Sequence, residues 1–268
     1  KVGKEHVVNN EFVNANFSPY TWNNVWGWGA EDIAYKLANA GYKIVLSNVT
    51  HLYFDLAYDR SPEEPGYYWG GFVGTKKPYE FIPLDIYKSA NENRMGDKID
   101  QSTLNGKERL TAAGKENILG IQGQLWTENT TSQALMEYLS FPKVIGLAER
   151  AWATTPKWVS IAKPEDRQKA IDAEYNKFSN TLAKRDLVRL EYISNSKKLN
   201  YRLPAPGAKV VNDTLYMNTE YPGFVMKYSV DGKTWLDYKT PTPVKGGTTV
   251  SLKLVAVSGR ESRVTTVK

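Results

Sequence analysis

The chain lacks cysteine altogether, so no disulfide can form. Its only histidines are His6 and His51, too few for a zinc site, which takes about three or four protein ligands. No apolar run approaches the roughly 18 residues of a membrane span, and the polar opening KVGKEHVVNN has no signal-peptide core. No glycine-rich phosphate loop or serine nucleophile elbow is present. These absences predict no metal, no cofactor and no membrane span.

Charge is only weakly biased, with 35 basic against 29 acidic residues, a formal net charge of +6 and an isoelectric point near 9.1. Basic chains that bind nucleic acid gather their cations in a patch or stripe. Here the cations are scattered, and the densest runs are pairs such as Lys76-Lys77 and Lys197-Lys198. A solvated surface is therefore expected, and nucleic acid is not a predicted partner.

Aromatic residues are plentiful, with 8 Trp and 17 Tyr among 268 residues. The hydrophobic share of 41% and the charged share of 24% are typical of a soluble chain with one large or two ordinary domains. Most of the Trp residues lie in the first half of the chain: Trp22, Trp26, Trp28, Trp69 and Trp126. Some of these rings must fill a core, but their density also favours a carbohydrate pocket.

The start of the chain predicts a strand, a helix and a second strand after an irregular opening over residues 1–18. Residues 20–28 predict an aromatic-rich strand, and residues 42–47 a short strand buried on both faces. Between them, residues 30–40 carry the apolar stripe of an amphipathic helix that ends at Gly41. Such a unit is a right-handed crossover, so a parallel sheet is expected.

Residues 55–117 form a long excursion with several prolines and glycines, and loops of this length in compact domains are commonly functional. Residues 117–126 predict the next buried strand. The helical patterns lie at 83–90, at 107–113, at 136–152 with a break near Pro142, and from Pro164 onward, where Ile171, Tyr175, Phe178 and Leu182 share one face.

The sequence pattern changes at residues 201–210, where Pro204, Pro206 and Gly207 predict a linker. Only short strands follow, including a hairpin with Asp231-Gly232 at its turn. About 65 residues of strands without cysteine indicate a small immunoglobulin-like sandwich.

The segment GIQGQLWTE at residues 120–128 predicts a buried strand that projects Trp126 and Glu128 from its carboxyl end. Gly120 and Gly123 thin this strand, as happens where a backbone bends or another group packs closely. An indole beside a carboxylate suits a sugar, whose apolar face lies on the ring while its hydroxyls donate to the acid. The segment alone also allows a core Trp beside a Glu that caps the next helix.

Side chains at the carboxyl ends of parallel strands gather at one edge of the sheet. The first predicted strand offers Trp22, Trp26 and Trp28, the second Tyr53 and Asp55, and the third Trp126 and Glu128. Trp69 reaches the same edge from the long excursion. We expect these residues to form a single site, whereas His51 beside it is expected to be a packing residue.

The order of these motifs resembles that of bacterial chitobiases, the β-N-acetylhexosaminidases of glycoside hydrolase family 20. The motifs are VLSNVTHLYFD at 45–55, PGYYWG at 65–70, QLWTE at 124–128, MEYLSFPKVIGLAERAW at 136–152 and YRLPAPGA at 201–208. The resemblance covers residues 20–268. It implies an α/β fold: the C-terminal part of a (β/α)8 TIM barrel over residues 1–200, and then the immunoglobulin-like sandwich over residues 201–268.

The resemblance also implies roles for the site residues. Trp126 matches one wall of the pocket for the terminal GlcNAc, and Trp22 another, although Trp26 or Trp28 could take that position. Tyr53 matches the tyrosine that orients the 2-acetamido group, Glu128 the carboxylate that binds the O4 and O6 hydroxyls, and Trp69 the platform for the second sugar. In this family the substrate's own acetamide oxygen attacks the anomeric carbon, forming an oxazolinium ion with retention of configuration.

One family feature is missing. The general acid and its partner are an adjacent Asp-Glu pair, and this chain contains no Asp-Glu dipeptide. Glu31-Asp32 is reversed and expected to complement a helix dipole, and Glu63-Glu64 lies in a proline-flanked loop. The chain is therefore expected to be the C-terminal part of a periplasmic or extracellular hexosaminidase, inactive alone and partnered by a missing N-terminal portion. A non-catalytic protein that binds GlcNAc-terminated oligosaccharides and a purely structural chain remain as alternatives.

Overall fold

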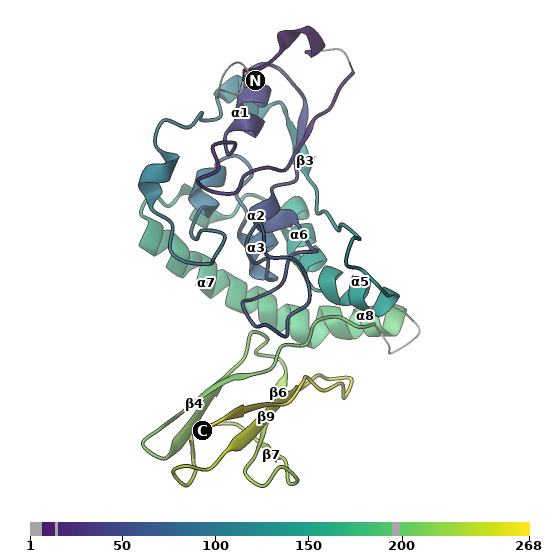
Figure 1. The fold of residues 1–268 in the computed structure, drawn as a ribbon, viewed down its shortest axis with the longest axis vertical. Coiled ribbons are helices and arrows are strands. Elements are labelled where there is room, and N and C mark those ends of the chain that lie inside the picture. The colour runs from purple at the N-terminus through teal and green to yellow at the C-terminus, as the bar shows by residue number, and fades with distance from the viewer. Residues whose placement is uncertain (1–6, 14–15, 195–198) are drawn as a thin grey trace. The chain divides into compact units, whose positions relative to one another are not determined.

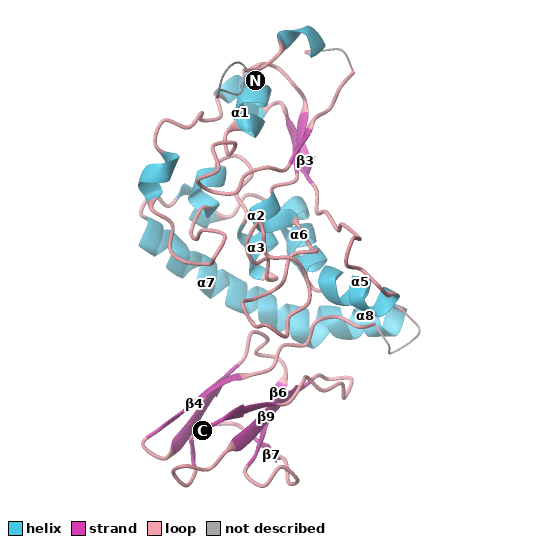
Figure 2. Ribbon diagram, in the orientation of Figure 1, coloured by secondary structure: helices cyan, strands magenta, loops and turns pink. Residues whose placement is uncertain are grey.

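A computed structural model describes residues 7–13, 16–194 and 199–268. The chain forms two compact units, residues 1–168 and 169–268. The first unit mixes helices with a small sheet, and the second consists of strands that follow a helical segment (Figures 1 and 2). Within the described residues, no helix is both long enough and apolar enough to span a membrane.

The sheet of the first unit has three parallel strands in the order β1-β2-β3. These are β1 (Tyr20–Thr21), β2 (Ile44–Leu46) and β3 (Ile118–Ile121). Helix α1 (Ile33–Asn39) links β1 to β2, as the predicted crossover requires. The parallel sheet therefore exists, while its place in a (β/α)8 barrel stays a prediction, since the described residues hold only these three parallel strands.

The predicted strand over residues 20–28 is wrong in its extent, because β1 ends at Thr21. Gly27 and Gly29 have φ angles of +91° and +85°, which residues with a Cβ rarely adopt, and they turn the chain here. The Trp28 N–H donates to the Val25 carbonyl at 3.1 Å within this turn. As a result Trp28 lies at the surface.

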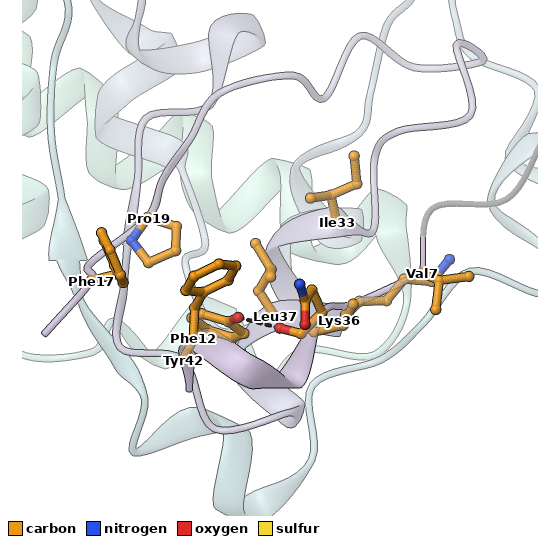
Figure 3. Close-up of a pocket in the computed structure, with 10 residues that line it drawn as sticks. Val7, Phe12, Phe17, Pro19, Ile33, Lys36, Leu37 and Tyr42 are labelled. Atoms are coloured by element: carbon orange, nitrogen blue, oxygen red, sulfur yellow. Dashed lines mark hydrogen bonds between the residues drawn. The ribbon is translucent and has the colours of Figure 1, made fainter. Parts of the chain in front are cut away.

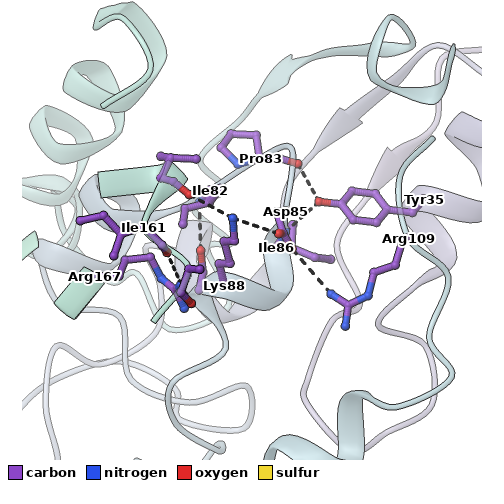
Figure 4. Close-up of polar contacts among 12 residues, drawn as sticks. Tyr35, Ile82, Pro83, Asp85, Ile86, Lys88, Arg109, Ile161 and Arg167 are labelled. Carbon is purple, nitrogen blue, oxygen red and sulfur yellow. Dashed lines mark hydrogen bonds and ion pairs between the residues drawn. The ribbon is translucent and has the colours of Figure 1, made fainter. Parts of the chain in front are cut away.

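A buried core packs around α1 and β2 and extends into the long excursion. Its members include Ala34, Tyr35, Ala38, Ile44, Leu46, Phe81, Ile86 and Tyr87. Polar contacts also tie the excursion to α1: the Tyr35 hydroxyl donates to the Pro83 carbonyl at 2.9 Å and accepts from the Ile86 N–H at 2.8 Å (Figure 4). The excursion is therefore an ordered part of the unit.

Short helical elements make up most of the regular structure outside this sheet. They are η1 (Asn10–Phe12), α2 (Val49–Leu52), α3 (Lys76–Glu80), η2 (Ile86–Ser89), η3 (Gln101–Leu104), α4 (Ala112–Lys115) and η4 (Lys157–Ser160). The predicted patterns at 83–90 and 107–113 overlap η2 and α4, whereas α2 and α3 were not predicted.

The longer helices follow the sequence pattern closely. The pattern over 136–152 is two helices, α5 (Gln133–Ser140) and α6 (Lys143–Trp152), and the predicted break near Pro142 is confirmed. Helix α7 (Pro164–Thr181) begins at the predicted proline. On its predicted apolar face Ile171 is buried and Tyr175 and Phe178 are half-buried.

The second unit continues with η5 (Leu182–Asp186), a π-helical turn, and α8 (Leu187–Ile193). Seven strands then form two antiparallel sheets, ordered β10-β9-β6-β7 and β4-β5-β8. They are β4 (Gly207–Val211), β5 (Thr214–Asn218), β6 (Val225–Ser229), β7 (Leu236–Asp237), β8 (Thr242–Pro243), β9 (Val250–Val255) and β10 (Thr265–Val267). The predicted β6–β7 hairpin is confirmed; the immunoglobulin-like topology and the domain boundary at residues 200 and 201 stay predictions.

The segment predicted as a linker, residues 201–210, starts with buried residues. Tyr201 is buried, and the Arg260 guanidinium lies 4.2 Å from the centre of its ring. The same guanidinium donates to the Leu199 carbonyl at 2.7 Å. Strand β4 then begins at Gly207, so the proline-rich segment is packed within the unit rather than free.

Candidate functional site

Five aromatic side chains gather beyond the carboxyl ends of the parallel strands and define the aromatic cluster. They are Trp22, Trp28, Tyr53, Trp69 and Trp126. Trp22 comes directly after β1 and Tyr53 directly after α2, and Trp126 lies in the loop that follows β3. The structure thus brings together residues from three strand ends and the long excursion, as expected from the sequence.

Tyr53 is the centre of the cluster. Its ring lies 6.4 Å from Trp22, 6.1 Å from Trp69 and 6.2 Å from Trp126, measured between ring centroids. Tyr53 is only 3% exposed, whereas Trp22 and Trp126 are 45% and 48% exposed. A buried phenol is thereby surrounded by indoles that face solvent, an arrangement that can hold a ligand with apolar faces.

Trp28 and Trp69 extend the cluster. Their rings are stacked, with centroids 6.3 Å apart and planes 27° apart. Trp69 also meets Trp22 edge to face at 6.1 Å. Trp28 is 53% exposed, so the stacked pair offers a second flat surface next to the first.

Trp26 lies elsewhere. It is buried in the core and contacts Tyr87, with ring centroids 6.5 Å apart. The sequence left Trp22, Trp26 and Trp28 as candidates for one pocket wall. Only Trp22 and Trp28 belong to the aromatic cluster, and of these only Trp22 is in ring contact with Tyr53.

Asp55 lies two residues beyond Tyr53 and is buried. Its carboxylate accepts a long hydrogen bond of 3.4 Å from the Trp126 N–H. Burial raises the pKa of Asp55, although backbone N–H donors and the Lys143 ammonium oppose the rise. The charge of Glu128 adds to the rise, so this exposed carboxylate acts on the same site.

Burial likewise raises the pKa of the Tyr53 phenol, and the Asp55 charge contributes to the rise, while a hydrogen bond with Trp126 opposes it. A raised pKa keeps the phenol protonated at neutral pH. The Tyr53 hydroxyl is therefore available as a hydrogen-bond donor. The neighbouring Asp55 and Glu128 carboxylates, when ionised, can only accept hydrogen bonds.

Backbone pairing brings these strand ends together. The Phe54 N–H donates to the Gln124 carbonyl at 2.6 Å, and the Gln124 N–H donates to the Leu52 carbonyl at 2.8 Å. Gly123 allows the close approach, since a Cβ there would lie 2.7 Å from the Phe54 ring. No atom lies within 4 Å of a Cβ at Gly120, where the pairing with β2 shifts register, so close packing explains Gly123 and not Gly120.

The loop that carries Trp69 is fixed against Asp55 by main-chain bonds. The Tyr67 N–H donates to the Asp55 carbonyl at 3.0 Å, and the Ala57 N–H donates to the Tyr67 carbonyl at 2.7 Å. Gly66 lies at the crossing with φ of +120°, and a Cβ there would lie 2.7 Å from the Asp55 carbonyl oxygen. Only glycine fits this crossing.

Two buried charges that support the cluster were not predicted. The first is Glu31, which lies at a helix start as expected, directly before Asp32, the N-cap of α1. The Glu31 carboxylate accepts from the Gly27 and Gly29 N–H groups at 2.6 and 3.1 Å and pairs with Lys107 at 2.6 Å. It therefore fixes the turn that presents Trp28.

Glu31 is ionised in this environment. Burial alone would raise its pKa, but the hydrogen bond and charge of Lys107 and the backbone N–H donors outweigh that effect and hold the pKa below its ordinary value. The second unpredicted charge is Lys143, a buried lysine at the start of α6 that donates to the Phe54 and Leu56 carbonyls.

His51 is fully buried, next to the site in sequence but not in the cluster. Its ring lies 5.3 Å from that of Phe81, and its Nδ1 lies 2.8 Å from the Thr50 hydroxyl. Burial lowers the pKa of His51 well below its ordinary value, and the charge of Lys77 acts in the same direction. His51 is therefore a neutral core residue, as expected.

Comparison with known proteins identifies the family. Residues 1–155 match the model described as glycosyl hydrolase family 20, catalytic domain, and residues 186–264 match the chitobiase/beta-hexosaminidase C-terminal domain. The chain belongs to glycosyl hydrolase family 20. The whole aromatic cluster of this family 20 chain lies inside the segment matched by the catalytic-domain model.

The relatives of this family 20 chain are considerably longer. The N,N'-diacetylchitobiase of Vibrio harveyi is 32% identical over 91% of the chain and 28% of the relative, and the beta-hexosaminidase of Vibrio vulnificus is 32% identical over 93% and 30%. The chain thus spans under a third of these relatives.

Solved structures of the family are also similar to it. One is the GH20 exo beta-N-acetylglucosaminidase from Vibrio harveyi in complex with N-acetylglucosamine, which is 24% identical over 69% of the chain and 22% of the solved chain, with a TM-score of 0.40.

Proposed function

We propose that this family 20 chain is the C-terminal part of a retaining exo-β-N-acetylhexosaminidase that removes terminal GlcNAc from chitobiose and chitooligosaccharides. The observation that carries the proposal is the buried Tyr53 phenol among exposed indoles, beside the buried Asp55. Pyranose rings present apolar faces to indoles and hydroxyls to carboxylates, so this cluster matches the chemistry of a sugar. A periplasmic or extracellular location belongs to the same proposal.

In the proposed reaction, Tyr53 donates a hydrogen bond to the acetamide oxygen of the bound GlcNAc. Trp22 and Trp126 wall the acetamido group and press its oxygen toward the anomeric carbon, which is a proximity effect. That oxygen attacks, the leaving alcohol departs, and the phenol stabilises the oxazolinium ion that forms. The raised pKa of Tyr53 keeps this donor protonated throughout.

The remaining members of the cluster serve binding. Glu128 is exposed and accepts hydrogen bonds from the O4 and O6 hydroxyls, and Asp55 contributes a second acid on the same side of the site. Trp69, stacked on Trp28, provides the platform for the next sugar of the chain. No cofactor or metal has a role in this scheme.

The general acid must come from elsewhere, because the chain has no Asp-Glu dipeptide. We propose that an upstream portion of the same enzyme supplies it and that this chain is inactive alone. Strand β1 pairs with β2 on one side and has no strand on its other side among the described residues. Edges of parallel sheets are normally covered, so β1 offers a place for a preceding barrel strand.

An apolar pocket beside this edge supports the same partner. It has a volume of about 470 Å³ and lies between the segment that leads to β1 and helix α1, with Phe12, Phe17, Leu37 and Tyr42 among its lining residues (Figure 3). Phe12, Phe17 and the neighbouring Tyr20 are exposed. Asn9 and Lys36 also line the pocket, but most of its lining is apolar, which suits packing against protein rather than sugar.

The test is to join this chain to an upstream segment that carries Asp-Glu and to assay chitobiose or an aryl β-GlcNAc. We expect hydrolysis with retained configuration by the longer protein and none by this chain alone. An inactive but folded longer protein would contradict the proposed activity, and turnover by this chain alone would contradict the missing acid.

A second function is favoured by the missing Asp-Glu pair alone: a non-catalytic protein that binds GlcNAc-terminated oligosaccharides. It shares the pocket but not the reaction. GlcNAc should then quench the Trp fluorescence of this chain and of Trp235→Phe, a variant outside the cluster, while the longer protein shows binding without turnover. If neither binding nor turnover is found, the chain is structural.

A further inference from the structure

Lys143 is a fully buried lysine with no part in the proposed chemistry. It is 0% exposed and lies at the first position of α6. Its Nζ donates to the Phe54 carbonyl at 2.7 Å and to the Leu56 carbonyl at 2.7 Å. These two carbonyls flank Asp55, so one ammonium group holds the backbone on both sides of that acid.

The ammonium has further compensation for its burial. It lies 3.9 Å from the centre of the Tyr58 ring, within the range of a cation–π interaction. Removing a charged amine from water is unfavourable unless acceptors replace the lost hydration. Two carbonyls and a ring face provide that replacement, and a methionine would fill the same volume without needing any of it.

The segment held by Lys143 is the one that carries the functional groups. Tyr53 and Asp55 alternate with the two residues whose carbonyls are bound. The same segment is also bound by Gln124 and by Tyr67 through main-chain hydrogen bonds. Lys143 adds the only side-chain bonds to these carbonyls among the described contacts, from a helix about 90 residues away.

We propose that Lys143 is a positioning residue, which holds Tyr53 and Asp55 where the acetamido group and a sugar hydroxyl need them. This inference rests on the proposed hexosaminidase function. Reacting groups displaced by about 1 Å can lose on the order of a hundredfold in rate, so loss of this bond should reduce turnover without removing any group that touches substrate.

The charge of Lys143 has an effect that geometry alone would not produce. It opposes the burial that raises the pKa of Asp55. Without the ammonium, Asp55 should take up its proton at a higher pH than in the wild type. The acid limb of the kcat–pH profile should therefore move toward neutral pH if ionised Asp55 is required.

The experiment compares Lys143→Met with the wild type in the longer protein that carries Asp-Glu, at temperatures where both are folded. We expect kcat to fall on the order of 10- to 100-fold, with the acid limb of its pH profile shifted upward. The matched control is Lys88→Met. Lys88 pairs with Asp85 at 3.6 Å (Figure 4) and donates to the Val159 carbonyl at 3.0 Å. None of these residues belongs to the aromatic cluster, so the loss of Lys88 should alter the melting temperature but not kcat.

A double variant tests whether Lys143 acts through Tyr53. Tyr53→Phe should lower kcat less in the Lys143→Met background than in the wild type, because the phenol is already displaced. Additive losses, or an unchanged kcat and pH profile in folded Lys143→Met, would overturn the inference. If Lys143→Met does not fold, Lys143→Gln, which keeps donors without charge, is measured in its place, with the same two outcomes.

Failure of the proposed function gives a different result. It removes turnover from the wild-type longer protein itself, before any variant is compared. An active wild type whose kcat is insensitive to Lys143 would leave the hexosaminidase function standing and reject only the positioning role.

Discussion

The aromatic cluster of the first unit differs in exposure from a set of aromatic side chains in the second unit. In the second unit Tyr201, Tyr221 and Phe224 are buried, with Tyr221 and Phe224 in edge-to-face contact at 5.6 Å. In the first unit Trp22 and Trp126 remain about half exposed. Buried rings serve packing, whereas exposed rings gathered around a buried phenol require another explanation. We propose that a ligand binds there.

The segments that carry rings of the aromatic cluster are bonded by buried charged side chains. The exposed Trp28 lies in a turn that the buried Glu31 carboxylate holds by hydrogen bonds. Tyr53 lies in a segment whose carbonyls are bound by the buried Lys143. Buried charges are costly unless they are paired or hydrogen-bonded, and the bonds of these two charges hold the segments that carry rings of the cluster. Substitutions in the two units should therefore separate stability from function.

The largest effect is expected in the second unit. Tyr221→Ala removes a fully buried ring and should lower the free energy of unfolding of that unit by about 3–5 kcal/mol. Chemical denaturation of this chain measures it, with Tyr216→Ala on the exposed face of β5 as the control. Quenching of Trp fluorescence by GlcNAc should persist in Tyr221→Ala as long as the first unit stays folded. Loss of quenching while the first unit is folded would contradict the separation of stability in the second unit from binding in the first.

Tyr53→Phe should act on turnover. In the longer protein it should lower kcat about 10- to 1,000-fold, the scale of losing one transition-state hydrogen-bond donor. Tyr87→Phe is the matched control, because it also removes a hydroxyl from a buried ring, one that donates to the Glu108 carbonyl at 2.7 Å outside the cluster. A wild-type rate in Tyr53→Phe would remove the phenol from the mechanism.

Glu128→Gln should weaken substrate binding. Loss of charge-assisted hydrogen bonds costs about 1.5–3 kcal/mol, so KM should rise roughly 10- to 150-fold while the unfolding free energy changes little. Glu116→Gln, at an exposed site before the same strand β3, is the control for the loss of charge. Equal KM values for the two variants would exclude Glu128 from the sugar site.

Glu31→Gln should have the smallest effect, visible as a change in pH dependence. Because the folded pKa of Glu31 is lowered, its contribution to stability is present above its ordinary pKa of about 4.5 and is lost as pH falls through the folded value. Thermal melts at pH 7 and below pH 4 should therefore differ less for Glu31→Gln than for the wild type. An unchanged difference would show that the carboxylate contributes nothing.

The sequence predicted those features of the fold that depend on local pattern. Pro142 and Pro164 divide and begin helices through backbone chemistry, and both were located correctly. The extent of β1 was mistaken because an aromatic-rich run resembles a strand, although Gly27 and Gly29 turn the chain. Trp26 could not be separated from Trp22 by pattern, since burial is decided by contacts with distant residues such as Tyr87.

The gathering of Tyr53 and Trp126 was predictable because parallel strands bring their carboxyl ends to one edge. The role of each residue stays a prediction. Glu31 and Lys143 were missed, since their partners are backbone groups whose position depends on the completed fold. A hint existed for Lys143: a cation at the start of an apolar helix, directly after Phe141-Pro142.

The crossing at Gly66 fixes the distance between the Trp69 loop and the segment that carries Tyr53, which are the two parts of the proposed sugar site. Any side chain at this position would push the Trp69 loop away from the segment that carries Tyr53 and Asp55. In the proposed site, the separation between Tyr53 and the Trp69 platform thus depends on the absence of a side chain at residue 66. Enlarging residue 66 should alter selectivity between a monosaccharide glycoside and a longer oligomer before it abolishes hydrolysis.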